Sequence, residues 1–172
     1  MTDIGCILAI DPGSERSAWL WFDTATGPTD FGISPNEDVL AALRGEGGPD
    51  QLAEPFDDVT GDDPDKPGLT VVIEKIESYG MTVGAEIFAT VHWSGRFTEA
   101  ARSVPVVQLP RRAVKLAICG DTRAKDANIR QALIDRFGGT PAIRKGGSLY
   151  GISKDVWSAL AIAVTYAEGG ES

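Results

Sequence analysis

The chain has 172 residues, of which 42% are hydrophobic and 24% carry a charge, proportions that are ordinary for a globular protein. This length suits one domain with a proper core, and no stretch has the run of about 18 apolar residues that a membrane-spanning helix requires. The first residues lack the basic start of a secretory signal, and two cysteines are too few for a disulfide framework or a zinc site. We therefore expect one cytoplasmic domain over residues 1–172, with no membrane partner.

The charges are distributed unevenly along the chain. The formal net charge of −9 argues, taken alone, against a nucleic-acid partner. Residues 46–68, however, hold eight acids and one base, whereas residues 96–145 hold eleven bases and four acids. A chain with charges segregated in this way can present a basic face despite an acidic total. The alternative, that these bases only solvate helix faces, stays open at this point.

Four apolar runs bounded by turn residues have the length and composition of β-strands. They span residues 4–10, 17–22, 69–74 and 104–109, and residues 29–33, after a turn at 26–28, could add a short third strand. In the last run, Pro105 favours an edge position in the sheet, because proline cannot donate to a neighbouring strand.

Helical spacing of apolar residues, with suitable starting and stopping residues, predicts five helices. They cover residues 35–43, 83–101, 111–117, 125–137 and 156–163. Ser153 is the expected N-cap of the last helix. Residues 46–68, rich in Gly, Pro and Asp, are predicted to form an acidic loop. Strands followed by interspersed helices indicate an α/β fold with a mixed β-sheet flanked by helices on both faces.

Three carboxylates occupy positions where a site would form. Asp11 ends the first strand directly before Pro12 and Gly13, Glu74 ends the fourth strand, and Asp155 stands at the start of the last helix. Since open α/β sheets place their sites at the carboxyl ends of strands, we expect the three side chains to meet. Each also has an ordinary explanation, as a turn residue, an exposed strand end or an acid that favours a helix N-terminus.

A cluster of this kind suits a divalent cation. Mg²⁺ prefers oxygen ligands and takes one or two carboxylates together with substrate phosphate. Two such ions sharing an acidic cluster can activate a water and stabilise the leaving oxygen in phosphodiester cleavage. Crowded carboxylates repel one another, so a metal is needed for all of them to ionise together. The sequence therefore predicts a site for cutting DNA that uses Mg²⁺, with Mn²⁺ able to substitute and two ions per active site.

The same residues carry a family resemblance. Ile-Asp-Pro-Gly at 10–13, Ile-Glu at 73–74 and Asp-x-x-Ser-Ala-Leu-Ala-Ile-Ala at 155–163 resemble, in order, the three acidic motifs of the RuvC-type Holliday junction resolvases, which belong to the ribonuclease H-like superfamily. The similarity runs along most of the chain apart from the acidic loop. It is strongest to phage-borne members in three stretches, residues 77–81, 94–97 and 125–133.

The resemblance implies a ribonuclease H-like fold and a Mg²⁺-dependent crossover junction endodeoxyribonuclease. Such an enzyme resolves Holliday junctions in DNA recombination and repair by symmetric nicking, in a bacterial cytoplasm or a phage-infected host. The resemblance puts Asp11, Glu74 and Asp155 at the metal-ligand positions, and Lys115 and Lys125 beside the scissile phosphate. It also implies a homodimer formed through the long helix that follows the fourth strand.

The sequence departs from the family pattern at one position. Bacterial resolvases usually carry a second acid three residues into the third motif, where this chain has Ser158. A spacing of three puts Asp155 and Ser158 on one helix face, so the hydroxyl could hold a metal-bound water. Glu77 is a further candidate ligand. The resemblance therefore leaves the number of metal ions open.

The residues expected to contact DNA are basic, aromatic or thioether side chains near these motifs. They are Tyr79, Met81, Arg96, Arg111, Arg112, Lys115, Arg123, Lys125 and Arg130. Tyr79 and Met81 follow Glu74 in a loop, where they could wedge into or stack on unpaired bases at a branch point, although a loop aromatic can equally serve packing. His92 is the only histidine and adjoins Trp93, which indicates helix packing rather than a catalytic role.

Four functions are compatible with these observations. The first is a metal-dependent endonuclease that resolves Holliday junctions or other branched DNA. The second is a branched-DNA-binding protein with the same fold that cuts weakly or not at all, because Ser158 replaces an acid. The third is a ribonuclease H-like nuclease acting on flaps or RNA–DNA hybrids, and the fourth is an acidic interaction module with no nucleic-acid role. We expect the first.

Overall fold

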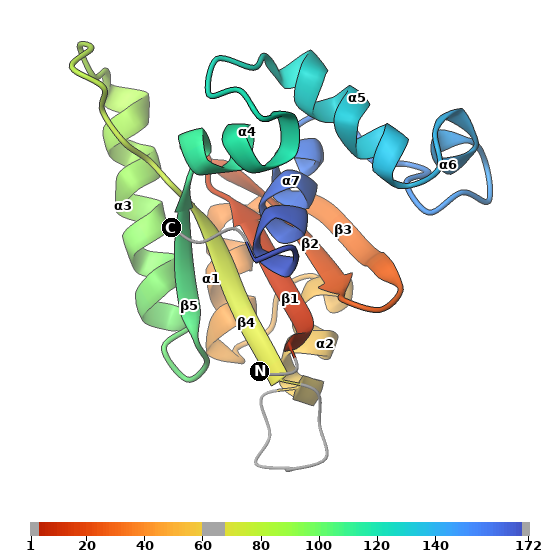
Figure 1. Cartoon of the computed structure of the whole chain (residues 1–172). Helices are drawn as coiled ribbons and strands as arrows, with labels where there is room; N and C mark the ends of the chain where they lie inside the picture. The colour runs from red at the N-terminus through yellow and green to blue at the C-terminus, as the bar shows by residue number, and fades with distance from the viewer. Residues whose placement is uncertain (1–3, 60–67, 170–172) are drawn as a thin grey trace.

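The computed structural model describes residues 4–59 and 68–169. In these ranges the strands are β1 (Ile4–Asp11), β2 (Arg16–Asp23), β3 (Gly27–Pro35), β4 (Gly68–Lys75) and β5 (Val106–Pro110). They form a sheet in the order β3-β2-β1-β4-β5 (Figure 1). The pairs β1–β2 and β2–β3 are antiparallel, whereas β1–β4 and β4–β5 are parallel. The predicted mixed sheet is confirmed, and β5 lies at its edge.

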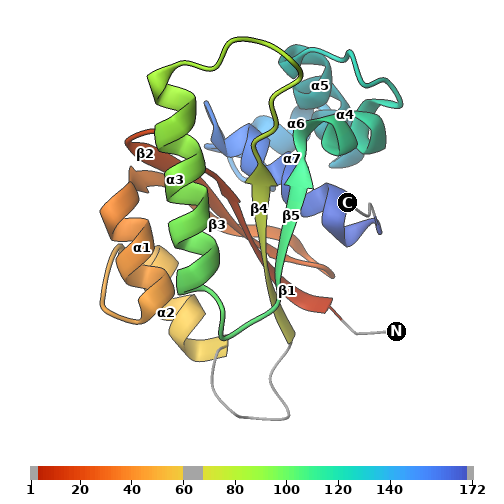
Figure 2. The ribbon, with the colours of Figure 1, turned by 90° about the vertical axis from the view of Figure 1, so that its left-hand side faces the viewer.

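Helices cover both faces of the sheet (Figure 2). On one face lie α1 (Asn36–Arg44), α2 (Asp50–Val59) and α3 (Ala85–Ala100). On the other face lie α4 (Arg111–Cys119), α5 (Asp126–Arg136), α6 (Thr140–Ile143) and α7 (Val156–Ala167). None of the helices in the described ranges has the length and apolar character needed to cross a membrane.

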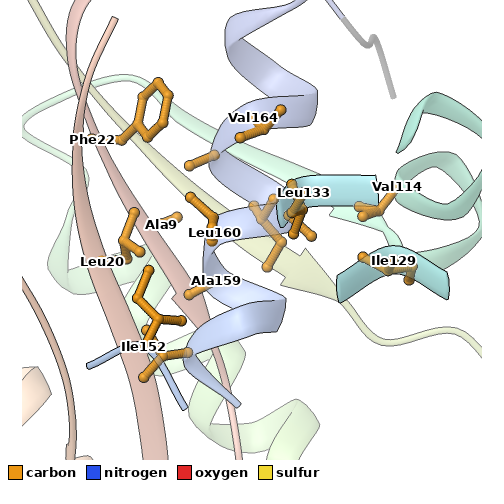
Figure 3. Close-up of a cluster of buried hydrophobic side chains, with 14 of the residues drawn as sticks. Ala9, Leu20, Phe22, Val114, Ile129, Leu133, Ile152, Ala159, Leu160 and Val164 are labelled. Atoms are coloured by element: carbon orange, nitrogen blue, oxygen red, sulfur yellow. The ribbon is translucent and has the colours of Figure 1, made fainter. Parts of the chain in front are cut away.

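The central strand β1 is buried on both faces, which explains its continuous apolar run. Ile7 and Ala9 belong to the core beneath α7, whereas Leu8 and Ile10 belong to the core beneath α1 and α3. Because side chains alternate along a strand, one run of four apolar residues supplies both cores. Figure 3 shows the first core, where Leu160 of α7 lies next to Ala9. This packing fixes α7 across the centre of the sheet.

One helix lies where the sequence predicted a loop. The prediction of an acidic loop over residues 46–68 is wrong where α2 forms. In this helix Leu52 and Phe56 are buried four residues apart. These two anchors pack into the core beneath α1, and they suffice to hold a short helix whose remaining composition is polar. The rest of the predicted loop includes residues 60–67, which lie outside the described residues.

The start of the last helix also differs from the prediction. The N-cap of α7 is Asp155 rather than Ser153, and the Asp155 side chain makes no capping hydrogen bond. Lys154, the residue before it, has φ of +50° and is the one non-glycine residue in the described ranges with a positive φ. A side chain in this conformation costs roughly 1–3 kcal/mol and is typical of functional sites. The chain therefore turns sharply at Lys154 and presents Asp155 with its carboxylate unused by the helix.

Candidate active site

Two of the predicted acids lie side by side where β1 and β4 end. Ile10 pairs with Ile73 in the parallel register, so the next residue of each strand is a carboxylate, Asp11 and Glu74. Glu74 is only 6% exposed, and Asp11 is half-buried. Asp155 approaches them from α7, which packs across β1 and β4. The structure thus brings the three predicted carboxylates to one edge of the sheet.

The electrostatics of Asp11 show how crowded this edge is. Its pKa is raised to about 9, chiefly by burial, then by a hydrogen bond with Glu74 and by the charges of Glu74 and Asp155. The guanidinium of Arg111 acts in the opposite direction. In the metal-free protein Asp11 therefore keeps its proton at neutral pH, because a further negative charge here lacks a sufficient counter-charge.

Arg111, the first residue of α4, supplies part of the positive charge. Its Nη1 donates a hydrogen bond to Oε1 of Glu74 at 3.1 Å, and its Nη2 donates to the carboxylate of Asp126. The register of β5 on β4 explains the first contact, since Pro110 pairs with Lys75 and Arg111 follows directly. Arg111 was predicted to contact DNA. Its bridge to Glu74 has no signal in the local sequence, because it depends on the order of the strands.

A closed ring of hydrogen bonds fixes the turn after Asp11. The Gly13 N–H donates to Oγ of Ser17 at 3.2 Å, the Ser17 hydroxyl donates to Oδ1 of Asn36 at 2.6 Å, and Nδ2 of Asn36 donates to the Gly13 carbonyl at 3.0 Å. A Cβ at Gly13 would lie 2.2 Å from the carbonyl oxygen of Arg16, so only glycine fits. Ser17 is therefore a positioning residue. Asn36 had no sequence signal, since its role arises only from the packing of α1.

Ser158 lies one helical turn after Asp155 and lines the same cavity as Asp155 and Glu74. Glu77, the further candidate ligand, is exposed and pairs with Lys75 at 3.1 Å.

Basic side chains gather on α4 beside the carboxylates. Arg111, Arg112 and Lys115 line a hollow of about 340 Å³ together with Tyr79. The hydroxyl of Tyr79 donates to Oε2 of Glu77 at 3.2 Å, and the tyrosine ring is 59% exposed. The loop after β4 and the helix α4 therefore form one surface that combines an accessible aromatic ring with three bases.

The other predicted DNA contacts from the second half of the chain lie on α5 or close to its start. Lys125 is the N-cap of α5, Arg130 lies on the same helix, and Arg123 lies in the loop before it, all three exposed. Met81, in the loop after β4, is 78% exposed.

Arg96 is the exception among the predicted DNA contacts. It lies on α3, pairs with Glu37 of α1 at 3.3 Å and sits 4.3 Å over the ring of Trp93. These contacts hold it on the face of the sheet opposite to α4 and α5. His92, its neighbour on α3, is exposed with its ring edge-on to Trp93.

The carboxylates were tested for their fit to a divalent cation. In the part of the chain that the structure describes, no three acidic, histidine or cysteine side chains are arranged to hold one ion together. Arg111 pairs with Glu74 in this structure. The donor set nevertheless suits a hard cation, because Asp11, Glu74 and Asp155 offer oxygen atoms only and Arg111 does not fully balance the charges around Asp11.

Solved structures provide a comparison for the fold. The chain is similar to Thermus thermophilus RuvC, with a TM-score of 0.62 at 16% identity over 94% of this chain and 93% of that chain. It is also similar to T. thermophilus RuvC in complex with a Holliday junction substrate, with a TM-score of 0.61 at 17% identity over 94% of this chain and 92% of that chain. No family model and no curated protein matches the sequence. The chain therefore has the RuvC fold, as its ordered acidic motifs predict.

Proposed function

We propose that the protein is a metal-dependent endonuclease that resolves Holliday junctions and related branched DNA by paired phosphodiester nicks. The observation that carries the proposal is the meeting of Asp11, Glu74 and Asp155 at one edge of a RuvC fold. The similar T. thermophilus RuvC is described in complex with a Holliday junction substrate, which supports the same class of DNA for this chain.

Different side chains would have different roles in the proposed reaction. Asp11, Glu74 and Asp155 would hold Mg²⁺ or Mn²⁺, up to two ions, and Ser158 would add a hydroxyl through a water molecule. When bound, the metal activates a water and stabilises the leaving oxygen of the phosphodiester. Lys115 belongs to the basic hollow on α4 and would hold the scissile phosphate from one side.

DNA would lie along the basic surface of α4 and α5. Its phosphates would meet Arg112, Lys115, Arg123, Lys125 and Arg130, whose charges explain how a protein with a net charge of −9 binds DNA. The loop after β4 supplies exposed apolar side chains for a branch point, where duplex stacking is already interrupted. We leave Arg96 out of this surface because of its contacts with α1.

Two copies would act together through the outer face of α3. Ile87, Phe88 and Val91 are 40%, 65% and 47% exposed and lie at helical spacing on this helix. An apolar face of this kind marks an interaction surface, and a two-fold dimer uses the same face of both copies. Such a homodimer would bring two active sites to the two equivalent strands of a junction.

The test is cleavage of a labelled four-way junction beside a linear duplex of the same sequence. Nicking should require Mg²⁺ or Mn²⁺, stop in EDTA and favour the junction. Cleavage of the two substrates at equal rates would contradict the junction assignment, and cleavage that persists in EDTA would contradict the metal requirement.

The second candidate is a branched-DNA-binding protein that cuts weakly. Two observations favour it, namely the ion pair of Arg111 with Glu74 and the serine at position 158. Both reduce the negative charge available for metal. Tight, salt-dependent binding of the junction without nicking in Mg²⁺ or Mn²⁺ would support this candidate over the first.

A further inference from the structure

A cavity of about 450 Å³ opens directly beside the carboxylates, between α4, α5 and α7. Its apolar lining includes Val114, Ile129, Ile152, Trp157 and Ile162. Val114 and Ile129 can be followed in Figure 3, facing α7. The volume lies within the range of roughly 300–1,000 Å³ that is typical of small-ligand sites. Glu74, Asp155 and Ser158 line part of the same cavity, but none of the roles assigned above uses its apolar part.

The cavity has an aromatic wall with a cation over it. The guanidinium carbon of Arg130 lies 5.1 Å from the centre of the Trp157 ring. Trp157 is half-buried, at the edge of the core, while Arg130 is exposed on α5. A cation over an aromatic ring gives a flat surface that also attracts negative charge.

The cavity shares residues with the proposed active site. Glu74 and Asp155 are part of its lining, and so are Ser158 and Lys154. Lys154 is also the residue with φ of +50°, so the backbone is held in an unfavourable conformation where the cavity meets the carboxylates. Backbone of this kind persists at sites that hold ligands, because the surrounding packing maintains it.

These features together describe one chemical class of ligand. A flat apolar wall suits an aromatic ring. Of the three cations that line the cavity, Arg111 pairs with Glu74 and Asp126, whereas Arg130 and Lys154 suit an attached phosphate. The cavity opens beside Asp155 and Glu74. A group bound in it can therefore belong to a strand whose backbone crosses the carboxylates. A purely aliphatic ligand would match the lining but would leave both cations without a counterpart in the ligand.

We propose that this cavity binds the base of one unpaired nucleotide, next to the phosphodiester that is cut, with Trp157 contacting the base and Arg130 and Lys154 close to its phosphates. This inference rests on the proposed function, because it takes branched DNA as the ligand. Unpairing a base costs a few kcal/mol and costs least where stacking is already interrupted. Binding one unpaired base would therefore make the site select branch points over intact duplex.

The test is a thermodynamic cycle between the protein and the DNA. A set of four-way junctions would each carry a single abasic position, moved one nucleotide at a time through the crossover. Binding of each junction would be measured by fluorescence anisotropy in EDTA, with wild-type protein and with Trp157→Leu. At one position, loss of the base should weaken binding to the wild type by about tenfold and binding to Trp157→Leu by less than twofold.

Two further variants guard against a folding defect at Trp157. Arg130→Gln changes an exposed side chain of α5 that lies over the Trp157 ring. Losing its phosphate contact should weaken binding of all the junctions, and losing its contact with Trp157 should also reduce the effect of base loss at the same position. Lys154→Gly suits the positive φ and removes only the side chain, so it should weaken binding of all the junctions alike. Trp93→Leu is the matched control, since Trp93 also has an arginine over its ring but lies on α3, and it should leave the tenfold effect intact.

A second measurement on the same junctions replaces the base at each position with 2-aminopurine. Its fluorescence should change on binding at the position found in the cycle, and the change should disappear with Trp157→Leu. Junction binding in which no position couples to Trp157 would overturn the inference and leave the proposed function standing. Failure of the wild type to prefer the junction over duplex would instead overturn the proposed function on which the inference rests.

Discussion

The sheet edge that carries Asp11 and Glu74 and the outer face of α3 depart in opposite ways from the usual distribution of buried apolar and exposed charged side chains. At the edge, acids are buried together, with Glu74 only 6% exposed. On α3, apolar side chains are exposed, with Phe88 at 65%. Both arrangements cost stability in an isolated chain. Under the proposed function each would become favourable with a partner, a cation at the carboxylates and a second copy of the chain on α3. The two regions can therefore be tested separately, by metal binding and by self-association.

The largest effect is expected at the buried edge. Glu74→Gln keeps the size of the side chain but removes the charge that would bind metal, so the nicking rate should fall by about 100-fold or more. Glu77→Gln is the matched control, because Glu77 lies three residues away, is exposed and pairs with Lys75. Single-turnover cleavage of a junction in Mg²⁺ measures both. Equal losses in the two variants would show that the edge has no special role.

A substitution that introduces a charge on α3 tests its exposed apolar face. Phe88→Glu should raise the dissociation constant of the proposed homodimer roughly 30-fold or more, because a carboxylate would be buried at the centre of an apolar contact. Tyr150→Glu, which replaces an aromatic residue of similar exposure outside α3, should leave it unchanged. Analytical ultracentrifugation over a dilution series measures the constant. A wild-type protein that stays monomeric at high concentration would remove α3 from the comparison.

The electrostatic cost of the edge should appear as a pH dependence of stability. In the metal-free protein the pKa of Asp11 is about 9, whereas in the unfolded chain this carboxyl loses its proton near pH 4, its usual range. Between these values the folded state binds more protons, so the free energy of unfolding falls as the pH rises. Asp11→Asn removes this dependence and should be more stable than the wild type at pH 8 by roughly 1–3 kcal/mol.

Urea unfolding in EDTA at pH 5 and pH 8 measures this difference. Identical slopes with pH for wild type and Asp11→Asn would show that Asp11 ionises freely in the folded protein. With saturating Mg²⁺, the free energy of unfolding of the wild type should fall much less as the pH rises, because the cation supplies the missing positive charge.

The smallest expected effect concerns the bridge made by Arg111. Arg111→Gln frees Glu74 from its cationic partner and should tighten Mg²⁺ binding by roughly fivefold, as expected for the loss of a partly exposed ion pair. Arg112→Gln is the control, since Arg112 is the next residue and makes no ion pair with Glu74 in the described structure. Isothermal titration calorimetry in the absence of DNA measures both. Weaker binding in Arg111→Gln would mean that the bridge organises the site for metal rather than competing with it.

Much of this arrangement could be predicted from local sequence. An apolar run that stops at an acid predicts a carboxylate at a strand end, and this reasoning located Asp11 and Glu74 correctly. Helical spacing in α3 predicted a helix but did not reveal which side faces the sheet, because Ile87 and Val91 proved exposed. The short helix α2 was missed since only two apolar anchors define it.

The remainder depends on contacts between distant segments. Arg111 reaches Glu74 only because β5 lies beside β4, and Trp157 meets Arg130 only because α5 packs against α7. Asn36 joins the turn after Asp11 from a separate helix. No spacing along the chain encodes these pairs, which arise from the order of strands and the packing of helices.

The most direct measurement is the mapping of nicks on a four-way junction whose four strands are labelled in turn. With Mg²⁺, the wild type should nick two opposite strands at equivalent positions near the crossover, and Asp11→Asn should bind the junction without nicking it. Nicks placed without symmetry, or equal nicking by wild type and Asp11→Asn, would contradict an active site built on these three carboxylates.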